Sequence, residues 1–188
     1  MMIDNTKVID NFLPDEQFKD LKNYMKSGLF PWYFSEAVEY AIDLNGNPES
    51  EADLKLMNVP TTQEELDWSF YSTHTIYKDN TIKTFDIVWQ KIKPVVDKLE
   101  VKSLIRIKAN MYPKTLKVLH HKNHVDGDFK HKGAIFYLNT CDGLTVLSDG
   151  TEVESVANRM LLFDSSQPHH STTTTDQNRR MNINFNYF

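Results

Sequence analysis

The sequence predicts a mainly β domain, a sandwich or barrel, backed by helices near its N-terminus. Two observations predict it. Apolar residues recur at helical spacing in parts of the first 100 residues, and after about residue 100 the spacing changes to the two-residue period of strands. Runs of strands that do not alternate with helices do not build a parallel doubly wound sheet. We therefore expect one domain over residues 1–188, with helical support and a variable substrate-side region in 1–100 and a β core in 101–188.

Two amphipathic helices are predicted before the strands. The first begins near Pro14, where proline and acidic residues favour a helix start, and its apolar face follows at helical spacing. The second spans most of residues 84–99 and has a longer apolar face, from Phe85 to Leu99. Pro94 lies inside it and is expected to kink or split it, because proline lacks the N–H that a helix interior needs.

Strands follow in the second half of the chain. Residues 105–112 alternate strictly, and the other predicted strands are rich in β-branched and aromatic residues. A turn at Ser148–Gly150 separates two of them. Besides 105–112, the predicted strands are residues 134–139, 144–147, 159–163 and 181–188.

The overall charge and the single cysteine limit the classes of function. The formal net charge is -5, so general binding to a nucleic-acid backbone, which requires clustered Lys and Arg, is not expected. Cys141 is the only cysteine, which excludes an internal disulfide and favours a reducing compartment. The sequence shows no signal peptide and no apolar run long enough to span a membrane. We expect a cytoplasmic protein that contacts neither nucleic acid nor membrane.

The stretch between the two predicted helices is acidic. From Glu36 to Asp67 it carries nine Asp or Glu and one Lys, whereas residues 102–132 are locally basic. Such asymmetry could steer a charged substrate, and one hypothesis is that the acidic stretch lies over the site and favours a cationic or peptide substrate. The alternative is a solvated loop that serves solubility.

A metal site is indicated by the distribution of histidines. His124 and Asp126 are two residues apart, so on an extended backbone both side chains leave the same face. A third ligand is available from His169 or His170, which follow the strand at 159–163. Two imidazoles and one carboxylate on one face of an octahedral ion form the facial triad of non-haem Fe(II) oxygenases. His120, His121 and His131 we interpret as ordinary surface or hydrogen-bonded histidines.

Alternation along the last strand separates an apolar from a polar face. Met181, Ile183, Phe185 and Tyr187 would pack against the helices. On the other face the strand carries polar residues that we expect to point into the pocket: Arg180, Asn182, Asn184 and Asn186. Arg179 would then lie on the apolar side or in the preceding loop.

Several motifs occur in an order that resembles a known family. Across residues 104–188 the chain is similar to the 2-oxoglutarate and Fe(II)-dependent dioxygenases of the double-stranded β-helix (jelly-roll, cupin-like) fold, in the prolyl 4-hydroxylase-like branch. Residues 8–13 match the entry strand and helix of that family more loosely. The motifs are Ala109–Pro113, His124–Asp126, Ile135–Asn139, Arg159–Phe163 with Pro168–His169, and Arg180–Phe185.

The resemblance implies a set of site residues. The metal ligands would be His124, Asp126 and His169; the family's Pro-His order favours His169, and His170 stays the alternative. Arg180 would hold the far carboxylate of the co-substrate, since a guanidinium pairs bidentately with it. Tyr137 would add a hydroxyl, Tyr112 would lie near the metal or simply pack in the core, and Asn184 would line the co-substrate site.

The activity implied is hydroxylation of an unactivated C–H bond, with succinate and CO2 released. Its cofactors would be Fe(II), 2-oxoglutarate and O2, with ascorbate as a reductant, and its substrate a prolyl or other peptide or a small molecule. Other classes stay open: a non-catalytic binding module of the same fold and a nucleic-acid or small-molecule demethylase. A zinc hydrolase is a third, and it has no use for a buried arginine opposite the metal.

Overall fold

The fold is built on two antiparallel sheets. The computed structural model describes residues 6–35 and 70–188, and its larger sheet has eight strands in the order β1-β9-β6-β11-β5-β3-β2, with β4 added beside β3. Every neighbouring pair in this sheet is antiparallel. Its strands are β1 (Lys7–Ile9), β2 (Tyr33–Ser35), β3 (Tyr71–Lys78), β4 (Thr81–Ile82), β5 (Leu104–Pro113), β6 (Lys132–Tyr137), β9 (Arg159–Asp164) and β11 (Arg179–Tyr187).

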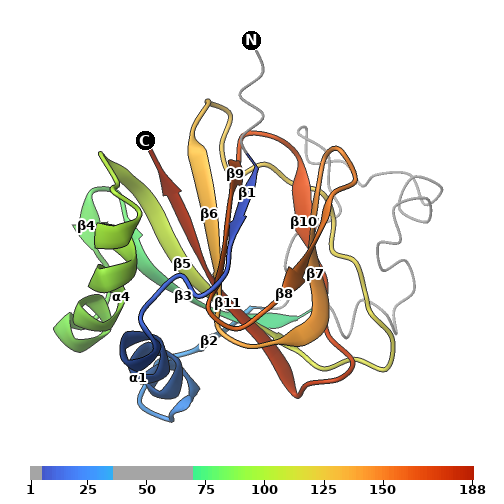
Figure 1. Ribbon diagram of the computed structural model, residues 1–188, viewed down its shortest axis with the longest axis horizontal. Helices are drawn as coiled ribbons and strands as arrows, with labels where there is room; N and C mark the ends of the chain where they lie inside the picture. Colours follow the sequence, from blue (N-terminus) through green and yellow to red (C-terminus); the bar gives the residue numbers. More distant parts are fainter. Residues whose placement is uncertain (1–5, 36–69) are drawn as a thin grey trace.

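The smaller sheet has three strands and lies opposite one face of the larger one (Figure 1). Its order is β10-β7-β8, all antiparallel. The strands are β7 (Cys141–Leu147), β8 (Glu152–Ser155) and β10 (His169–Ser171). Two facing antiparallel sheets form a jelly-roll core, so the predicted fold class is confirmed.

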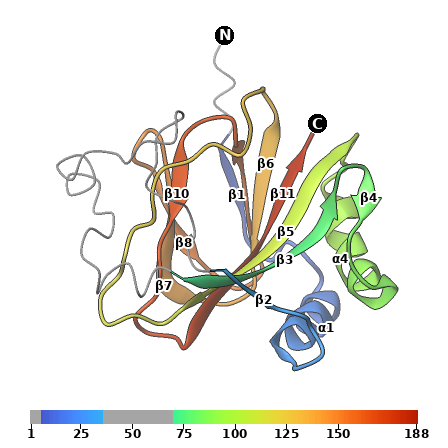
Figure 2. The same cartoon turned by 180° about the vertical axis from the view of Figure 1, so that it is seen from behind.

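Two helices cover the other face of the large sheet, as Figures 1 and 2 both show. They are α1 (Asp15–Lys26) and α4 (Asp86–Lys98), close to the two predicted ranges. Each buries one apolar stripe, and that stripe packs against Met181, Ile183, Phe185 and Tyr187 of β11 in the main core. The helix α4 is not split at Pro94, because its buried face on both sides of the proline is fixed by packing.

The layer between the two sheets is smaller and more polar. Its apolar part is a cluster of five buried residues, to which β6, β8 and β9 contribute: Ile135, Tyr137, Val153, Leu161 and Phe163. Around this cluster lie many of the protein's buried polar side chains, among them Arg180, Thr145 and Asn182. Buried polar groups need partners, so this layer is where a polar site can form.

The five predicted strands all occur, but strands also lie earlier in the chain than expected. Apart from the entry strand that the resemblance implies near residues 8–13, strands were expected only after about residue 100, and β2, β3 and β4 correct that expectation. β3 is the longest of them and pairs with β5. Its sequence, Tyr-Ser-Thr-His-Thr-Ile-Tyr-Lys, has few aliphatic residues, and its register shifts between Thr75 and Tyr77, which obscures the two-residue period.

The acidic stretch from Glu36 to Asp67 lies outside the residues that the structure describes. The predicted turn at Ser148–Gly150 is present, with Gly150 at a φ of 84°. In the described ranges, no helix is both long and apolar enough to cross a lipid bilayer.

Candidate metal centre

His124 and Asp126 lie in the connection between β5 and β6. They were expected on a strand, and this is a correction: the motif is not part of a regular strand, and an isolated bridge between His124 and His169 joins it to β10. Two backbone hydrogen bonds form the bridge, His124 N to His169 O and His169 N to His124 O, each 3.0 Å. The Asp126 N–H donates to Ser165 O at 3.0 Å, which fixes the far end of the motif.

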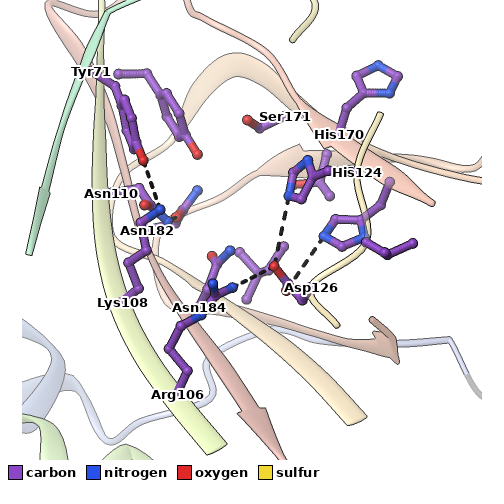
Figure 3. Close-up of a pocket in the computed structure, with 15 residues that line it drawn as sticks. Tyr71, Arg106, Lys108, Asn110, His124, Asp126, His170, Ser171, Asn182 and Asn184 are labelled. Atoms are coloured by element: carbon purple, nitrogen blue, oxygen red, sulfur yellow. Dashed lines mark hydrogen bonds and ion pairs between the residues drawn. The ribbon is translucent and has the colours of Figure 1, made fainter. Parts of the chain in front are cut away.

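The three predicted ligands converge on one point. Figure 3 shows two of them, His124 and Asp126, facing each other. One ligand atom from each of His124, Asp126 and His169 lies within 4.8 Å of the other two. His124 Nε2 is 3.9 Å from Asp126 Oδ1, and His169 Nε2 is 3.8 Å from Asp126 Oδ2. In the described parts of the chain no other set of three such side chains meets this condition. We refer to these three residues as the triad.

The donor set of the triad suits a divalent transition metal. His169 Nδ1 contacts the Gln167 carbonyl at 3.0 Å and His124 Nδ1 contacts the Lys122 carbonyl at 3.4 Å, which turns both Nε2 atoms toward Asp126. Metal-binding histidines typically use one ring nitrogen for such a contact and the other for the metal. His169 Nε2 is buried and has no hydrogen-bond partner among the described residues. Because buried polar atoms normally have a partner, a bound metal ion would satisfy this nitrogen.

The protonation states also suit a metal site. Burial lowers the pKa of the His169 imidazole to about 4, with the nearby His124 acting in the same direction and Asp126 opposing it. Burial likewise lowers the pKa of His124. For Asp126, burial alone would raise the pKa, but Arg106, His169 and a hydrogen bond from Asn186 hold it below its usual value. Two neutral imidazoles therefore face one carboxylate anion at neutral pH.

A network of side chains holds the Asp126 carboxylate in place. Arg106 Nη2 donates to Oδ1 at 2.6 Å, and Asn186 Nδ2 donates to Oδ2 at 2.9 Å. Arg106 Nε also donates to Asn186 Oδ1 at 3.1 Å, so the two partners of the carboxylate support each other. His131 and Ser165 contact the Asn186 amide from behind. His131 is thus hydrogen-bonded, as predicted for it.

Arg180 is fully buried at the β7–β8 side of the same layer. Its Nε donates to Ser155 Oγ at 2.6 Å, its Nη2 to Thr145 Oγ1 at 3.0 Å and its Nη1 to Thr172 O at 3.2 Å. All three acceptors are uncharged, and among the described residues no carboxylate forms an ion pair with this guanidinium. A buried cation without a counter-charge is costly unless a ligand supplies one.

The other predicted residues lie around Arg180 or along the cavity wall. Tyr137 is buried and its hydroxyl donates to Thr145 Oγ1 at 2.8 Å, the same oxygen that Arg180 contacts. Tyr112 lies beside Arg180, with its ring 5.4 Å from the guanidinium, and stacks 5.7 Å from Tyr71. Asn184 lines the cavity, and its Oδ1 is buried without a hydrogen-bond partner.

The triad, Tyr112, Asn184 and Thr145 line a cavity of about 250 Å³ between the sheets, and Arg180 and Tyr137 are linked to it through Thr145 Oγ1, which both contact. The triad forms one side, and Lys108 with Tyr71 lies across from it, joined by a 2.8 Å hydrogen bond (Figure 3). Asn110, Asn182 and Asn184 lie on β5 and β11, which form the wall between them. The volume is near the lower end for small-ligand pockets, as a compact ligand requires.

His121 and His170 lie near the triad but do not belong to it. His121 is fully buried beside Tyr112, its Nδ1 is 2.7 Å from Ser171 Oγ, and burial lowers its pKa to about 3, with Arg180 contributing. It is hydrogen-bonded, as expected for it, but it is not a surface residue. His170 contacts His120 instead of Asp126, so the structure brings His169 and not its neighbour to the triad.

Sequence reasoning missed several residues that shape the site. They come from strand positions that face the layer between the sheets: Arg106 and Lys108 on β5, Thr145 on β7 and Ser155 on β8. The alternation that singled out Arg180 would also have placed Arg106 and Lys108 with Tyr112 on one face of β5. Nothing in the sequence indicated that the polar face of β7 and β8 would meet Arg180.

The fold and the site together define a jelly roll with a two-histidine, one-carboxylate cluster between its sheets. No family model matches the sequence, and no curated protein matches it. Solved structures do match. A prolyl hydroxylase from Trichoplax adhaerens, in complex with a peptide fragment of the hypoxia inducible factor oxygen degradation domain, has a TM-score of 0.59 and 16% identity, over 99% of this chain and 84% of that one.

A prolyl-4-hydroxylase from Pseudomonas putida is similar at a TM-score of 0.55 and 13% identity, over 97% of this chain and 91% of that one. At these identities the likeness is one of fold. The chain therefore has the prolyl hydroxylase-like fold that the motifs indicated.

Proposed function

We propose that residues 1–188 form one Fe(II)- and 2-oxoglutarate-dependent dioxygenase domain, which hydroxylates an unactivated C–H bond. The observation that supports it most is the pairing, in one layer, of the triad with a buried guanidinium that lacks a counter-charge. A facial triad suits Fe(II), and the guanidinium suits a dicarboxylate co-substrate. A metal hydrolase or a simple metal-binding module would need only the first of these features.

In this proposal the ion is held by His124 Nε2, His169 Nε2 and one oxygen of Asp126. Arg106 and Asn186 already bind the two oxygens of this carboxylate, so they set its orientation before any ligand arrives. Such supporting contacts reduce the reorganisation needed on binding and are a general feature of metal sites.

Arg180 would bind the far carboxylate of 2-oxoglutarate. A guanidinium has five N–H groups, and three of Arg180's are used by Ser155, Thr145 and Thr172. One N–H on each terminal nitrogen then has no acceptor among the described residues, which is the pair that a carboxylate accepts bidentately. Thr145 Oγ1 accepts from both Arg180 and Tyr137, so its own proton is available to the same carboxylate.

With these ligands in place, a bound ferrous ion would supply O2 activation coupled to decarboxylation of 2-oxoglutarate to succinate and CO2, with ascorbate as a reductant that keeps it ferrous. The protein's own contribution is to bind, orient and shield. Tyr112, Tyr137 and Ile135 exclude water from the layer, since Tyr137 is fully buried and the other two nearly so.

A prolyl residue in a peptide is the first substrate to test. The support is limited to fold: the Trichoplax adhaerens structure with the same fold is a prolyl hydroxylase with a bound peptide fragment. Because one fold hosts many substrates, a small molecule or a different amino acid is the next class to test. We propose no nucleic-acid substrate, since the net charge is -5, and we propose a cytoplasmic location.

The test is an anaerobic titration of the metal-free protein with Fe(II) and 2-oxoglutarate, followed by the visible metal-to-ligand charge-transfer absorption band. We expect the band in the parent protein, its loss in Asp126→Ala, and a large rise in the 2-oxoglutarate concentration needed in Arg180→Met. Arg179→Met is the matched control, because Arg179 is the adjacent residue on β11 and contacts Met111 Sδ at 3.8 Å.

Circular dichroism would establish that each variant is folded. A folded parent that shows no band, or an Arg179→Met variant as impaired as Arg180→Met, would contradict the proposal and leave a binding module of the same fold. Consumption of O2 and release of succinate in the presence of candidate peptides would then identify the substrate.

A further inference from the structure

The neighbouring strands β5 and β11 carry a row of cross-strand pairs toward the layer between the sheets. One of these pairs holds the Asp126 carboxylate, and another, in the proposed function, binds the co-substrate. The two pairs between them line the cavity and have no part in either. In order along the strands, the four pairs are Arg106 with Asn186, Lys108 with Asn184, Asn110 with Asn182, and Tyr112 with Arg180.

Lys108 is the cation of the two middle pairs, and its ammonium group is held at the cavity wall. Its Nζ donates to Tyr71 Oη at 2.8 Å and lies 5.1 Å from the centroid of the same ring. The Tyr71 ring stacks in turn on Tyr112, with centroids 5.7 Å apart. Figure 3 shows Lys108 and Tyr71 across the cavity from His124 and Asp126. The ammonium group therefore faces the space beside the triad.

The charge of Lys108 acts on the triad. Burial lowers the pKa of His124, Asp126 opposes this shift, and Arg106 and Lys108 reinforce it. Among the described residues that line the cavity, Asp126 is the only carboxylate, and Arg106 and Asn186 already bind its two oxygens. A divalent ion at the triad would add positive charge. The wall at Lys108 therefore favours a further anion in the cavity.

Asn184 lies directly opposite Lys108 and complements it. Residues paired in this way have Cβ atoms about 4.5–5.5 Å apart. Asn184 Oδ1 is buried and has no hydrogen-bond partner among the described residues, and an amide oxygen only accepts. In the other middle pair, Asn110 Nδ2 donates to Asn182 Oδ1 at 3.1 Å, so its two amides partner each other. A cation beside an unused acceptor suits a carboxylate with an N–H or O–H on the neighbouring carbon.

We propose that Lys108 and Asn184 form a substrate subsite, in which Lys108 binds a carboxylate of the substrate and Asn184 accepts a hydrogen bond from the group beside it. Tyr71 is a positioning residue that holds the ammonium group in place. The inference rests on the proposed function, because it assigns the Arg180 side of the layer to 2-oxoglutarate. The substrate class is then a small carboxylic acid such as a free amino acid. An internal residue of a peptide has no charge at its backbone carbonyl.

Acetate can test the subsite before any substrate is known. In the Mn(II)-loaded protein saturated with 2-oxoglutarate, acetate bound at Lys108 lies near a paramagnetic ion, so the relaxation rate of its methyl protons measures binding. Acetamide is the neutral probe of the same shape. We expect enhanced relaxation for acetate and much less for acetamide. Lys108→Met should weaken acetate binding by about tenfold, as the loss of a charge-assisted pair would, and Lys108→Arg should retain most of it.

Lys78→Met is the matched control, because Lys78 is an exposed lysine on β3 outside the cavity lining, and it should leave acetate binding unchanged. Calorimetry should give the same 2-oxoglutarate affinity for Lys108→Met and the parent protein. A tenfold loss there would assign Lys108 to a carboxylate of the co-substrate and overturn the inference.

Three other results would also overturn the inference: no acetate effect in the parent protein, an equal effect of acetamide, or an acetate effect that survives Lys108→Met. Acetate binding that depends on Lys108, in a protein that shows no charge-transfer band, would contradict the proposed function and leave the carboxylate subsite standing.

Discussion

Arg179 and Arg180 are neighbours on β11, yet the two side chains lie in different environments. Arg180 is fully buried in the layer between the sheets, whereas Arg179 is partly exposed and touches a methionine sulfur. Successive side chains of a strand leave opposite faces, so one residue of register decides which arginine can serve the site. The same alternation places Asn182, Asn184 and Asn186 with Arg180.

Gly143 is the residue that gives the Arg180 side chain its space. A Cβ at this position would lie 2.5 Å from Arg180 Cδ and 2.7 Å from Thr173 O. Since the second of these is a backbone atom, the clash cannot be relieved by a side-chain rotation alone. We expect Gly143→Ala to displace the guanidinium and to weaken 2-oxoglutarate binding by about tenfold or more, as the loss of a charge-assisted pair would.

Binding of 2-oxoglutarate to the Mn(II)-loaded protein, measured by calorimetry, checks this expectation. Gly28→Ala is the control, because nothing lies within 4 Å of a Cβ there. Equal affinities in Gly143→Ala and the parent protein would show that Arg180 does not bind the co-substrate.

At the scale of elements, the triad depends on a short connection that no regular strand supports. The segment with His124 is held to β10 and the residue after it by two isolated bridges and a hydrogen bond from His121 N to Ser171 O, and β10 itself is held to β7 along three residues. The N-terminal segment is attached in a similar way. Asn158, before β9, accepts from Leu13 N at 2.8 Å and donates to Leu13 O at 2.8 Å, and it adopts a φ of 65°.

Asn158→Ala should therefore destabilise the protein through this one attachment. It removes two buried hydrogen bonds and leaves the backbone N–H and C=O of Leu13 without their side-chain partner. It also places alanine at a positive φ, a conformation that asparagine tolerates better. We expect the free energy of unfolding to fall by about 2–4 kcal/mol. Urea denaturation followed by tryptophan fluorescence measures it.

Asn80→Ala is the comparison, because Asn80 also has a positive φ, 55°, but is exposed. It isolates the backbone cost, which is about 1 kcal/mol. If the two variants lost equal stability, the hydrogen bonds from Asn158 to Leu13 would contribute nothing.

At the scale of the whole molecule, the site places several neutral histidines inside the layer between the sheets. Burial lowers the pKa of His121 to about 3 and those of His169 and His170 to about 4, against an ordinary value of 6.5. An unfolded chain binds these protons at higher pH than the folded chain does. The stability that the neutral forms confer is therefore complete above about pH 6.5 and is lost as the pH falls toward 4.

We expect the metal-free protein to lose stability below pH 6.5 with a slope of up to about 1.4 kcal/mol per pH unit for each such group. Urea denaturation at intervals from pH 7.5 to 4.5 gives that slope. His121→Gln should make it shallower, because one titrating group is gone. A slope that His121→Gln leaves unchanged would mean that His121 is not buried as a neutral imidazole.

Local pattern was enough to predict both helices, five of the strands and the polar face of β11, because each follows from the spacing of residues close in the chain. It was also enough to select His124, Asp126 and His169 as candidates, which the fold brings within 4.8 Å. It missed β3, in which polar residues and a register shift hide the period. It also placed the His-Asp motif on a strand, although the bridge that extends this segment comes from β10.

What the sequence by itself determined is both helices, five of the strands, and the order of the site motifs: a His-Asp pair followed by a Pro-His and an arginine. The tertiary structure decided which of the two adjacent histidines joins the triad and which arginine binds the Asp126 carboxylate. His169 rather than His170 meets Asp126, because β10 is distant in sequence from the 120–126 segment and lies beside it only in the folded protein. Arg106 binds Asp126 because the connection after β5 folds back over that strand. Contacts of that kind depend on which faces pack together, and no local period encodes them.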